Sequence, residues 1–343
     1  MDLRSAYLED LDLSGAKADL LHALFDSKTQ WPASNKMPTG FDWQKIMEIG
    51  KNPGLGIRSL HEEGITGKGV KIAIIDQPLI IDHIEYPDRI RLYEEINVVP
   101  GTPSQMHGPG VTSIAVGKSA GVAPDANVYY MAAFNFDPYD ANHQINCKYT
   151  AEAIHRILEI NQQIPTGQKI RAISMSIGLN PANKGYDELI AAINEAKDAG
   201  IFPITVSLGI THDQNILGLG REPLSDPDQF QSYEPSAWWA QDFFKQGSVR
   251  DTLLLPMDSR TIASPTGQED YAFYPQGGMS WAVPYLAGMY ALAVQVRPDI
   301  TPGEFLAAAM KTGKRIQIQR SGKEYALGTI LDPRALIEEI KNK

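Results

Sequence analysis

The sequence predicts an α/β fold, a three-layer αβα sandwich built on a central, mostly parallel sheet. From residue 67 onward, short apolar runs of strand length alternate with patterns typical of helices. The runs are nearly continuously apolar, as in strands that helices cover on both faces. With 43% hydrophobic and 21% charged residues, the composition is that of an ordinary globular protein and excludes a disordered or low-complexity chain.

Four apolar runs are the predicted strands of this sheet: residues 70–76, 126–134, 172–177 and 202–208. Helical patterns separate them. Thr150 and Asp187 are candidate caps for two of these helices, and Thr301-Pro-Gly-Glu304 has the form of a capping box for a third, nearer the C-terminus. Strand–helix alternation of this kind gives right-handed crossovers between parallel strands, so functional residues are expected at the carboxyl ends of the strands.

One long stretch, from Tyr271 to Val296, contains no charged residue. Its first third carries Pro275, Gly277 and Gly278, which favour a turn. A membrane span needs about 20 predominantly apolar residues without such a break. We therefore expect a glycine turn followed by a helix that is buried on all sides.

The first 50 residues lack a strand-like run and contain a turn cluster from Trp31 to Asn35. We predict that residues 1–45 are an N-terminal extension and that residues 46–343 form a single domain. One hypothesis is that the Trp31-Pro32 turn lies near the functional cleft and delays activity until the extension is removed. The alternative is that the extension only adds a packing layer.

The chain carries 41 acidic and 31 basic side chains, a formal net charge of −10. Such a charge repels nucleic acid and anionic membranes, so neither is an expected partner. Cys147 is the only cysteine, which excludes an internal disulfide and favours a reducing compartment. The first residues show neither the basic start nor the apolar core of a secretory signal, and we expect a cytoplasmic protein.

Three polar residues stand at predicted element ends. Asp76 ends the first apolar run, His107 opens a His-Gly-Pro-Gly segment, and Ser280 follows two glycines and opens the buried helix. Each alone is compatible with a common structural role, as a turn or helix cap or as a surface histidine. Together they offer a nucleophile, a base and a carboxylate that orients the base. The helix start also places free N–H groups beside the serine oxygen, where an oxyanion would develop.

The order Asp76, His107, Ser280 and the sequence around each residue resemble the subtilisin-like serine proteases. Further motifs of that family follow in the same order over most of the chain, so residues 46–343 resemble a subtilisin-like peptidase domain. The matching segments are Gly67–Asp76, the pair His107-Gly108, the turn Gly121-Val-Ala-Pro124, the strand segment Ser174–Gly178, the nucleophile motif Gly278-x-Ser280-x-Ala282-x-Pro284-x-x-Ala287-Gly288, and the closing segment from Leu327 to Leu336.

The resemblance implies a role for each of these residues. Ser280 would be the nucleophile, His107 the general base and then the general acid, and Asp76 the group that orients the imidazole. The implied function is that of a serine endopeptidase, which cleaves peptide or protein substrates through an acyl-enzyme and needs no cofactor. The residues implied to pair backbone to backbone with an extended peptide are Ser176, Ile177 and Gly178.

Two departures from the family pattern leave the three catalytic candidates in place. After the aspartate the family usually has Thr or Ser and then Gly, whereas this chain has Gln77 and Pro78. Pro78 removes a backbone donor that would support the carboxylate. Gly110 stands where a second histidine is frequent.

A third departure concerns the oxyanion hole. Family members carry an asparagine after the fourth strand that donates to the oxyanion, and the aligned residue here is Gly209. Loss of one such donor costs roughly 100- to 1,000-fold in rate. The alternative function is therefore a catalytically weak or inactive pseudo-peptidase that binds extended peptides or a protein partner. The nearby side chains available to replace the asparagine are Thr211, His212, Gln214 and Asn215.

No metal is expected. The segment between His107 and Pro124 is too short for the calcium-binding loop of many family members, and no EF-hand or zinc spacing occurs. Asp82, His83 and Glu85 are close in the sequence, but a zinc site needs more converging ligands, so we expect solvent-exposed side chains there.

A different hypothesis makes Cys147 a nucleophile with His143 as its base. Because the sequence offers no context that would orient this pair, an unreactive cysteine is the favoured interpretation.

Overall fold

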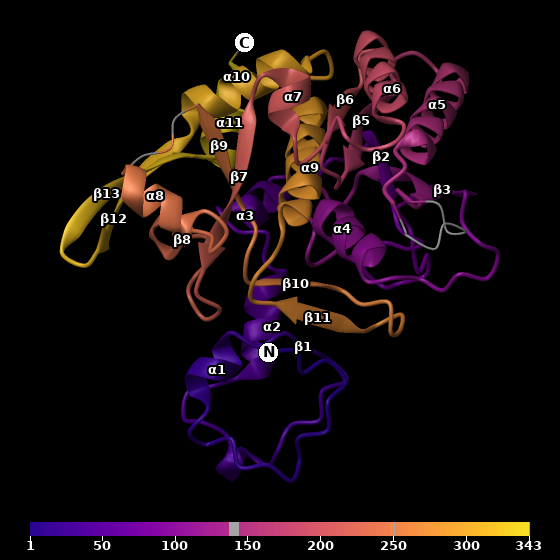
Figure 1. Cartoon of the computed structure of the whole chain (residues 1–343). Helices are drawn as coiled ribbons and strands as arrows, with labels where there is room; N and C mark the ends of the chain where they lie inside the picture. Colours follow the sequence, from indigo (N-terminus) through magenta and orange to yellow (C-terminus); the bar gives the residue numbers. More distant parts are fainter. Residues whose placement is uncertain (137–143, 248, 250, 343) are drawn as a thin grey trace.

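The computed structural model describes the chain except for residues 137–143, 248, 250 and 343. Figure 1 shows the arrangement of the helices and strands. The helices are α1 (Lys17–Leu21), α2 (Trp43–Lys51), α3 (Ile57–Glu62), α4 (His107–Val116), α5 (Lys148–Gln163), α6 (Tyr186–Asp198), α7 (Leu208–His212), α8 (Ala240–Gln246), α9 (Met279–Val296), α10 (Pro302–Thr312) and α11 (Pro333–Lys341). The strands are β1 (Phe25–Asp26), β2 (Lys71–Asp76), β3 (Ile90–Ile96), β4 (Asn127–Ala133), β5 (Ile170–Met175), β6 (Phe202–Ile204), β7 (Asn215–Arg221), β8 (Tyr233–Pro235), β9 (Thr252–Pro256), β10 (Arg260–Ala263), β11 (Tyr271–Tyr274), β12 (Lys314–Arg320) and β13 (Lys323–Ile330).

The central sheet has five parallel strands in the order β3-β4-β2-β5-β6. In its middle, Ile74 of β2 lies opposite Tyr130 of β4 and Ser174 of β5. The strands therefore end at a common edge, which brings the residues that follow β2, β4 and β5 close together. Of the predicted strands, the first three are present with small changes at their ends.

Helices cover both faces of this sheet, which confirms the predicted three-layer αβα architecture. Alternate residues of β2 point to opposite sides. Ile72 and Ile74 belong to the core formed with α4 and α9, whereas Ala73 and Ile75 belong to the core formed with α5 and α6. Burial of both faces is the reason that β2 reads as a continuous apolar run.

The expected buried helix is α9. It contacts β5 and β6 of the central sheet, β7 and β9 of a second sheet, and α4. Every residue from Trp281 to Val294 is buried, as this surrounding requires. None of the helices within the described residues combines the length and hydropathy of a membrane span.

A second sheet, in the order β12-β13-β9-β7-β8, lies on the other side of α9 and was not predicted. Strands β7, β9 and β13 run parallel, and β8 and β12 are antiparallel edges. The fourth predicted strand is also shorter than expected, because β6 ends at Ile204. The hydroxyl of Thr205 accepts a hydrogen bond from the backbone N–H of Ser207 at 3.2 Å, and the chain then enters α7.

Two of the predicted helix caps need correction, and the third is confirmed. Thr150 lies inside α5, whose N-cap is Cys147, and Gly185 is the N-cap of α6. Asp187 instead occupies the first turn of α6, where its charge complements the helix dipole. The capping box of Thr301 and Glu304 is present at the start of α10.

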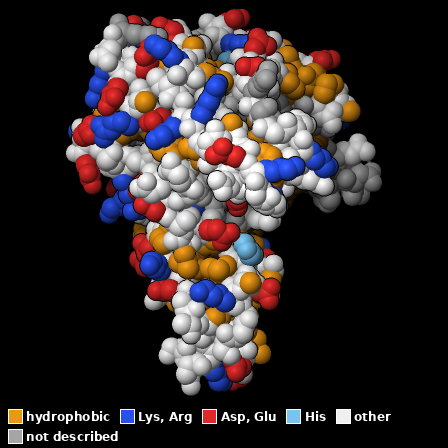
Figure 2. Space-filling model, turned by 90° about the vertical axis from the view of Figure 1, so that its left-hand side faces the viewer, with side chains coloured by type: hydrophobic (Ala, Val, Ile, Leu, Met, Phe, Trp, Pro, Cys, Tyr) orange, Lys and Arg blue, Asp and Glu red, His pale blue; other side chains and the backbone are white. Residues whose placement is uncertain are grey.

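The N-terminal residues pack against the third sheet, β1-β11-β10. Phe25 of β1 pairs with Phe273 of β11, and both are fully buried in a common hydrophobic cluster. Trp31 contributes its ring to the same cluster, edge-on to Phe25 and stacked on Trp43. Figure 2 shows this part of the chain as a narrow lobe below the main body. The boundary at residue 45 remains a prediction.

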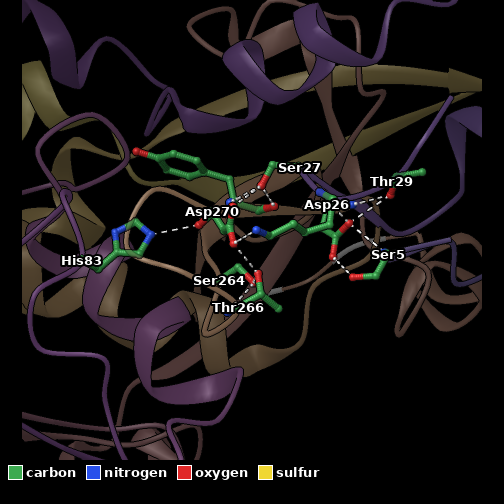
Figure 3. Close-up of polar contacts among 10 residues, drawn as sticks. Ser5, Asp26, Ser27, Thr29, His83, Ser264, Thr266 and Asp270 are labelled. Carbon is green, nitrogen blue, oxygen red and sulfur yellow. Dashed lines mark hydrogen bonds and ion pairs between the residues drawn. The ribbon is translucent and has the colours of Figure 1, made fainter. Parts of the chain in front are cut away.

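Two carboxylates stabilise this lobe (Figure 3): Asp26 binds residues within it, and Asp270, between β10 and β11, binds it from outside. Asp26 accepts hydrogen bonds from the backbone N–H of Ser5 at 2.8 Å and from the hydroxyl of Thr29 at 3.0 Å. Asp270 forms an ion pair with Lys28 at 3.1 Å. The N-terminal segment is thus held by apolar packing and by polar contacts together.

Candidate active site

Asp76 and His107 meet at the carboxyl edge of the central sheet. Asp76 is the last residue of β2, and His107 is the first residue of α4. The Oδ1 atom of Asp76 lies 2.7 Å from Nδ1 of His107 and accepts the backbone N–H of Gln77 at 2.8 Å. Asp76 is only 7% exposed, so these two contacts replace lost water. The Gln77 N–H supplies support despite the proline that follows it.

The environment of His107 favours its protonated form. Burial lowers the pKa of His107, but the charge of Asp76 and the hydrogen bond to it outweigh burial and raise the pKa above 6.5. Because Asp76 occupies Nδ1, Nε2 is the ring atom left to accept a proton. The indole of Trp281 packs on the imidazole with ring centroids 5.5 Å apart. The ring is thus held by a hydrogen bond at one edge and by an aromatic face.

At two positions of α4, neighbouring atoms lie so close to the backbone that a Cβ atom would crowd them, which accounts for the glycines there. A Cβ atom at Gly108 would lie 2.5 Å from the carbonyl oxygen of Gln77 and 2.7 Å from the hydroxyl of Tyr130. A Cβ atom at Gly110 would lie 2.8 Å from Ile262. A histidine at position 110, which the family often has, would therefore not fit beside the packed ring of Trp281, 3.0 Å away.

Ser280 is the second residue of α9, and the extended Gly278 precedes this helix as its N-cap. The backbone N–H groups of a first helical turn have no partner within the helix. The carbonyl oxygen of Ser280 accepts a hydrogen bond from the hydroxyl of Ser176 at 2.9 Å. The next residue, Trp281, contacts His107. The start of α9 is therefore held between the end of β5 and the histidine.

A cavity of about 170 Å³ opens beside Asp76 and His107. It lies at the carboxyl ends of β2, β4 and β5, where parallel sheets place their ligands. Its size suits a side chain rather than a large ligand. The lining residues are Ile75, Asp76, Gln77, His107, Ala133, Phe134, Asn135, Thr150, Ser176 and Ile177.

The segment after β5 is only partly free for pairing with a peptide. Ile177 donates its backbone N–H to Met175 at 2.8 Å, and its carbonyl oxygen accepts the N–H of Val206 at 3.1 Å. Both backbone groups of Ile177 are thus used inside the chain. Its side chain lines the cavity together with Ser176.

The subtilase family model matches residues 67–239, about half of the chain. This protein belongs to the subtilase family. The matched part contains Asp76, His107 and the Ser176–Gly178 segment, and the sequence resemblance to the family is thereby confirmed.

Curated relatives of this subtilase are distant. Subtilisin-like protease PopC of Myxococcus xanthus (strain DK1622) is 23% identical over 300 residues, which are 78% of this chain and 60% of PopC. Serine protease AprX of Bacillus subtilis (strain 168) is 24% identical over 278 residues, which are 70% of this chain and 60% of AprX. The chain thus spans about 60% of the length of these relatives.

Solved structures with the same fold include the prenylagaramide maturation protease PagA, with a TM-score of 0.58 at 17% identity over 84% of this chain and 99% of that one. The PatG macrocyclase in complex with a peptide has a TM-score of 0.56 at 15% identity, over 84% and 96% of the two chains. At these identities the likeness shows the fold alone.

The segment that the sequence aligns with the oxyanion asparagine of the family is helical. Residues 208–212 form α7. The hydroxyl of Thr211 donates to the carbonyl of Leu208 at 3.2 Å, and the side-chain amide of Gln214 donates to the carbonyls of Asn215 and Asp251, each at 3.1 Å. Both donors are therefore already used.

The other two candidates of that segment also have local roles. His212 packs edge-on against Phe202 with ring centroids 4.8 Å apart. Burial, followed by the charge of Lys197, lowers the pKa of His212 to about 4. Asn215 begins β7, and a Cβ atom at Gly209 would lie 2.3 Å from its side-chain oxygen. The structure thus packs Asn215 against the position that would carry the family asparagine.

The acidic cluster near residue 83 is buried, which corrects the expectation of solvent exposure for His83 and Glu85. His83 is fully buried and contacts the carbonyl oxygen of Asp270 at 2.9 Å. Glu85 accepts hydrogen bonds from the hydroxyls of Ser119 and Tyr271 at 2.5 and 2.6 Å. These partners account for the burial of the two side chains. Within the described residues, no group of three or more His, Cys, Asp or Glu side chains is arranged to hold a metal.

Cys147 is buried just before α5, and burial raises the pKa of its thiol. A raised pKa lowers the fraction of reactive thiolate. His143, its suggested base, lies outside the described residues.

Sequence reasoning missed two residues of this site. Trp281 supports His107, and its position inside the nucleophile motif gave no separate signal. Asp258 accepts the backbone N–H of Gly277, in the turn before Ser280, at 2.7 Å. The sequence does contain a sign of Asp258, because it is the first charged residue after an apolar run, as Asp76 is.

Proposed function

We propose that this subtilase is a serine endopeptidase with Ser280 as nucleophile, His107 as general base and acid, and Asp76 as the orienting carboxylate. The observation that carries the proposal is the 2.7 Å contact between Asp76 and His107, beside a helix start that bears Ser280. The family membership and the protease relatives support a hydrolase of this kind.

In the proposed reaction, Nε2 of His107 takes the proton of the Ser280 hydroxyl while its oxygen bonds to the peptide carbonyl carbon. The imidazolium then gives that proton to the leaving amine, and an acyl-enzyme remains. Water, activated by the same ring, releases the acid. Asp76 stays ionised throughout and stabilises the imidazolium, in agreement with the raised pKa of His107.

The oxyanion would be stabilised by the backbone N–H of Ser280 at the start of α9. Thr211 and Gln214 donate their hydrogen bonds elsewhere, so a second donor from these two side chains is not at hand. A subtilase that lacks one oxyanion donor should be slower by roughly 100- to 1,000-fold than one with both. The Asn215 side chain, which lies beside Gly209, is the remaining candidate for that donor. Without it we expect a slow protease, and the loss of the family asparagine favours the second candidate, a pseudo-peptidase that binds extended peptides or a protein partner.

The proposed substrate is an extended peptide or protein segment. The backbone groups of Ser176 and Gly178 would pair with it, since those of Ile177 are used within the chain. The cavity beside His107 would take one substrate side chain. The peptide held by the PatG macrocyclase supports this class of ligand.

Three further parts of the proposal come from the sequence. Residues 46–343 are the catalytic domain and residues 1–45 an attached layer. The lone buried Cys147 favours the cytoplasm. The reaction needs no cofactor, and neither nucleic acid nor a membrane is a proposed partner.

Labelling with a fluorophosphonate probe tests the proposal, because the probe reacts only with an activated serine. We expect labelling of the native protein at Ser280, none for Ser280→Ala, and unchanged labelling for the exposed control Ser14→Ala. Degradation of an unstructured protein that stops in Ser280→Ala separates the slow protease from the pseudo-peptidase. A folded native protein that is not labelled by the probe and does not degrade the unstructured substrate would overturn the endopeptidase proposal.

A further inference from the structure

A buried carboxylate contacts the turn that precedes Ser280. Asp258 follows β9 and is 6% exposed. Its Oδ1 atom accepts the backbone N–H of Gly277 at 2.7 Å. Bonds from an N–H group to an ionised carboxylate are shorter and about twice as strong as neutral ones. The carboxylate therefore holds this turn more firmly than an uncharged acceptor would.

Gly277 is confined on several sides. A Cβ atom at this position would lie 2.6 Å from the carbonyl oxygen of Met257 and 2.6 Å from the indole of Trp281. The indole N–H of Trp238, a side chain that is 70% exposed, donates to the carbonyl oxygen of Gly277 at 3.2 Å. The turn is thus fixed at its N–H by Asp258 and at its carbonyl by Trp238. The same turn leads into Trp281, which packs on His107.

The charged side chains around Asp258 do not compensate its negative charge. Burial raises the pKa of Asp258 to about 6, although the bonds from Gly277 and Ser236 act in the opposite direction, and the charge of Glu234 on β8 raises it further. Asp258 also lines a second cavity of about 750 Å³, whose other charged or titratable side chains are His22, Arg221, Glu222, Tyr233, Glu234 and Arg320.

The two cations of this cavity have other partners. Arg221 of β7 donates to backbone carbonyls, among them those of Ser225 at 2.7 Å and Ser259 at 2.9 Å. The guanidinium of Arg320 on β12 lies over the ring of Phe244. Among the described residues, no ion pair with Asp258 is present. Asp258 thus keeps a buried charge without a cation, and Gly277, in the turn before Ser280, donates to it at 2.7 Å.

We propose that Asp258 is a positioning residue, whose carboxylate holds the Gly277–Gly278 turn so that the start of α9 presents Ser280 to His107. This inference rests on the proposed function, because it assigns a role to Asp258 through Ser280. In its ionised form Asp258 fixes the turn, and on protonation the charge-assisted bond is lost and the turn loosens. Reactivity of Ser280 then depends on two groups, deprotonated His107 and ionised Asp258.

Ionisation of Asp258 lowers the stability of the fold, although it favours the reactivity of Ser280. An acid whose pKa is raised in the folded state binds its proton more tightly there, so its ionisation destabilises the fold as the pH rises from the unfolded pKa of about 4 through about 6. Asp258→Asn removes that cost and keeps an oxygen acceptor. We therefore expect Asp258→Asn to unfold at a higher temperature than the native protein at pH 7.5 while Ser280 reacts more slowly. A residue with a purely structural role would not separate the two.

The test measures the rate of fluorophosphonate labelling of Ser280 between pH 5 and 8. For the native protein we expect the rate to fall by about 100-fold per pH unit at the acidic end, since two protons are involved. For Asp258→Asn we expect a rate lower by up to about 100-fold at pH 7.5 and a fall of only about tenfold per pH unit. Glu234→Gln should move the titration of Asp258 in the rate profile to lower pH and leave the labelling rate at pH 7.5 unchanged. Glu222→Gln, in the same cavity, is the matched control.

The outcomes are distinguishable. If the native protein labels and Asp258→Asn has the same rate and the same slope, Asp258 does not position the turn and the inference fails alone. If the native protein does not label, the proposed function fails and the inference with it. If Asp258→Asn does not fold, Glu234→Gln decides, because an acidic limb identical to that of Glu222→Gln would overturn the role of Asp258.

Discussion

At the scale of single residues, the site depends on two carboxylates in similar positions with different environments. Asp76 ends the apolar strand β2, Asp258 follows the apolar strand β9, and both are largely buried. Asp76 faces an imidazole that becomes positive, so its charge has a partner when it is needed. Asp258 faces only neutral donors, and burial raises its pKa to about 6. The two carboxylates are buried to a similar degree and differ in the neighbour that each one faces.

Asp76→Asn tests two contributions of this aspartate, its effect on the pKa of His107 and its control of the imidazole tautomer. Removal of its charge leaves burial as the main influence on His107, so the pKa of the histidine falls below 6.5 and the acidic limb of the pH–rate profile moves to lower pH. The asparagine also permits the wrong imidazole tautomer, and the rate should fall by about 10⁴-fold. The measurement is the pH dependence of probe labelling, with the exposed Asp88→Asn as control. An acidic limb at the native pH in Asp76→Asn would contradict the assignment.

At the scale of elements, the site is made by helix starts that approach strand ends closely. The start of α4 fits against the end of β2 because Gly108 has no side chain. The start of α9 is held by Ser176 after β5 and by Asp258 after β9. A local pattern in the sequence predicts β2, β5 and the starts of α4 and α9, but not β9. The spacing between them depends on contacts of residues that are far apart in the chain.

Gly108→Ala tests this close approach. The added methyl group would meet Gln77 and Tyr130 at 2.5 and 2.7 Å, so we expect a loss of about 1–3 kcal/mol in the free energy of unfolding. Gly303→Ala is the matched control, because nothing lies within 4 Å of its added Cβ and alanine favours the helix by up to about 1 kcal/mol. Urea unfolding of both variants measures the difference. Equal stability of the two would show that α4 tolerates a side chain at its start.

At the scale of the molecule, the contacts of the N-terminal segment bear on its two suggested roles. The cavity beside His107 has no lining residue from positions 1–45. The segment instead covers Tyr271 and Phe273 of β11 with its own apolar side chains. Arg4 also donates to the hydroxyl of Tyr274 at 3.0 Å, and Tyr274 packs edge-on against Trp281. The segment thus reaches Trp281 through Tyr274, and we propose that it acts as a packing layer.

Deletion of residues 1–41 leaves Asp42, the N-cap of α2, in place. We expect a lower thermal midpoint, because the deletion exposes the buried ring of Phe273, and a specific activity no higher than that of the full chain. Thermal unfolding and probe labelling of the two proteins are the measurements. A truncated protein that is as stable and more active would favour autoinhibition instead.

The sequence identified most of the central sheet, the buried helix and the three catalytic candidates, because each is written in a short local pattern. Continuous apolar runs signal strands covered on both faces, and a motif such as Gly-x-Ser keeps its spacing in any context. The second sheet was missed; its parallel pairings of β9 with β7 and β13 join segments that are far apart in the chain. For the same reason, three features came only from the packing of the whole chain: the partners of Thr211 and Gln214, the burial of His83 and Glu85, and the contact of Asp258 with Gly277.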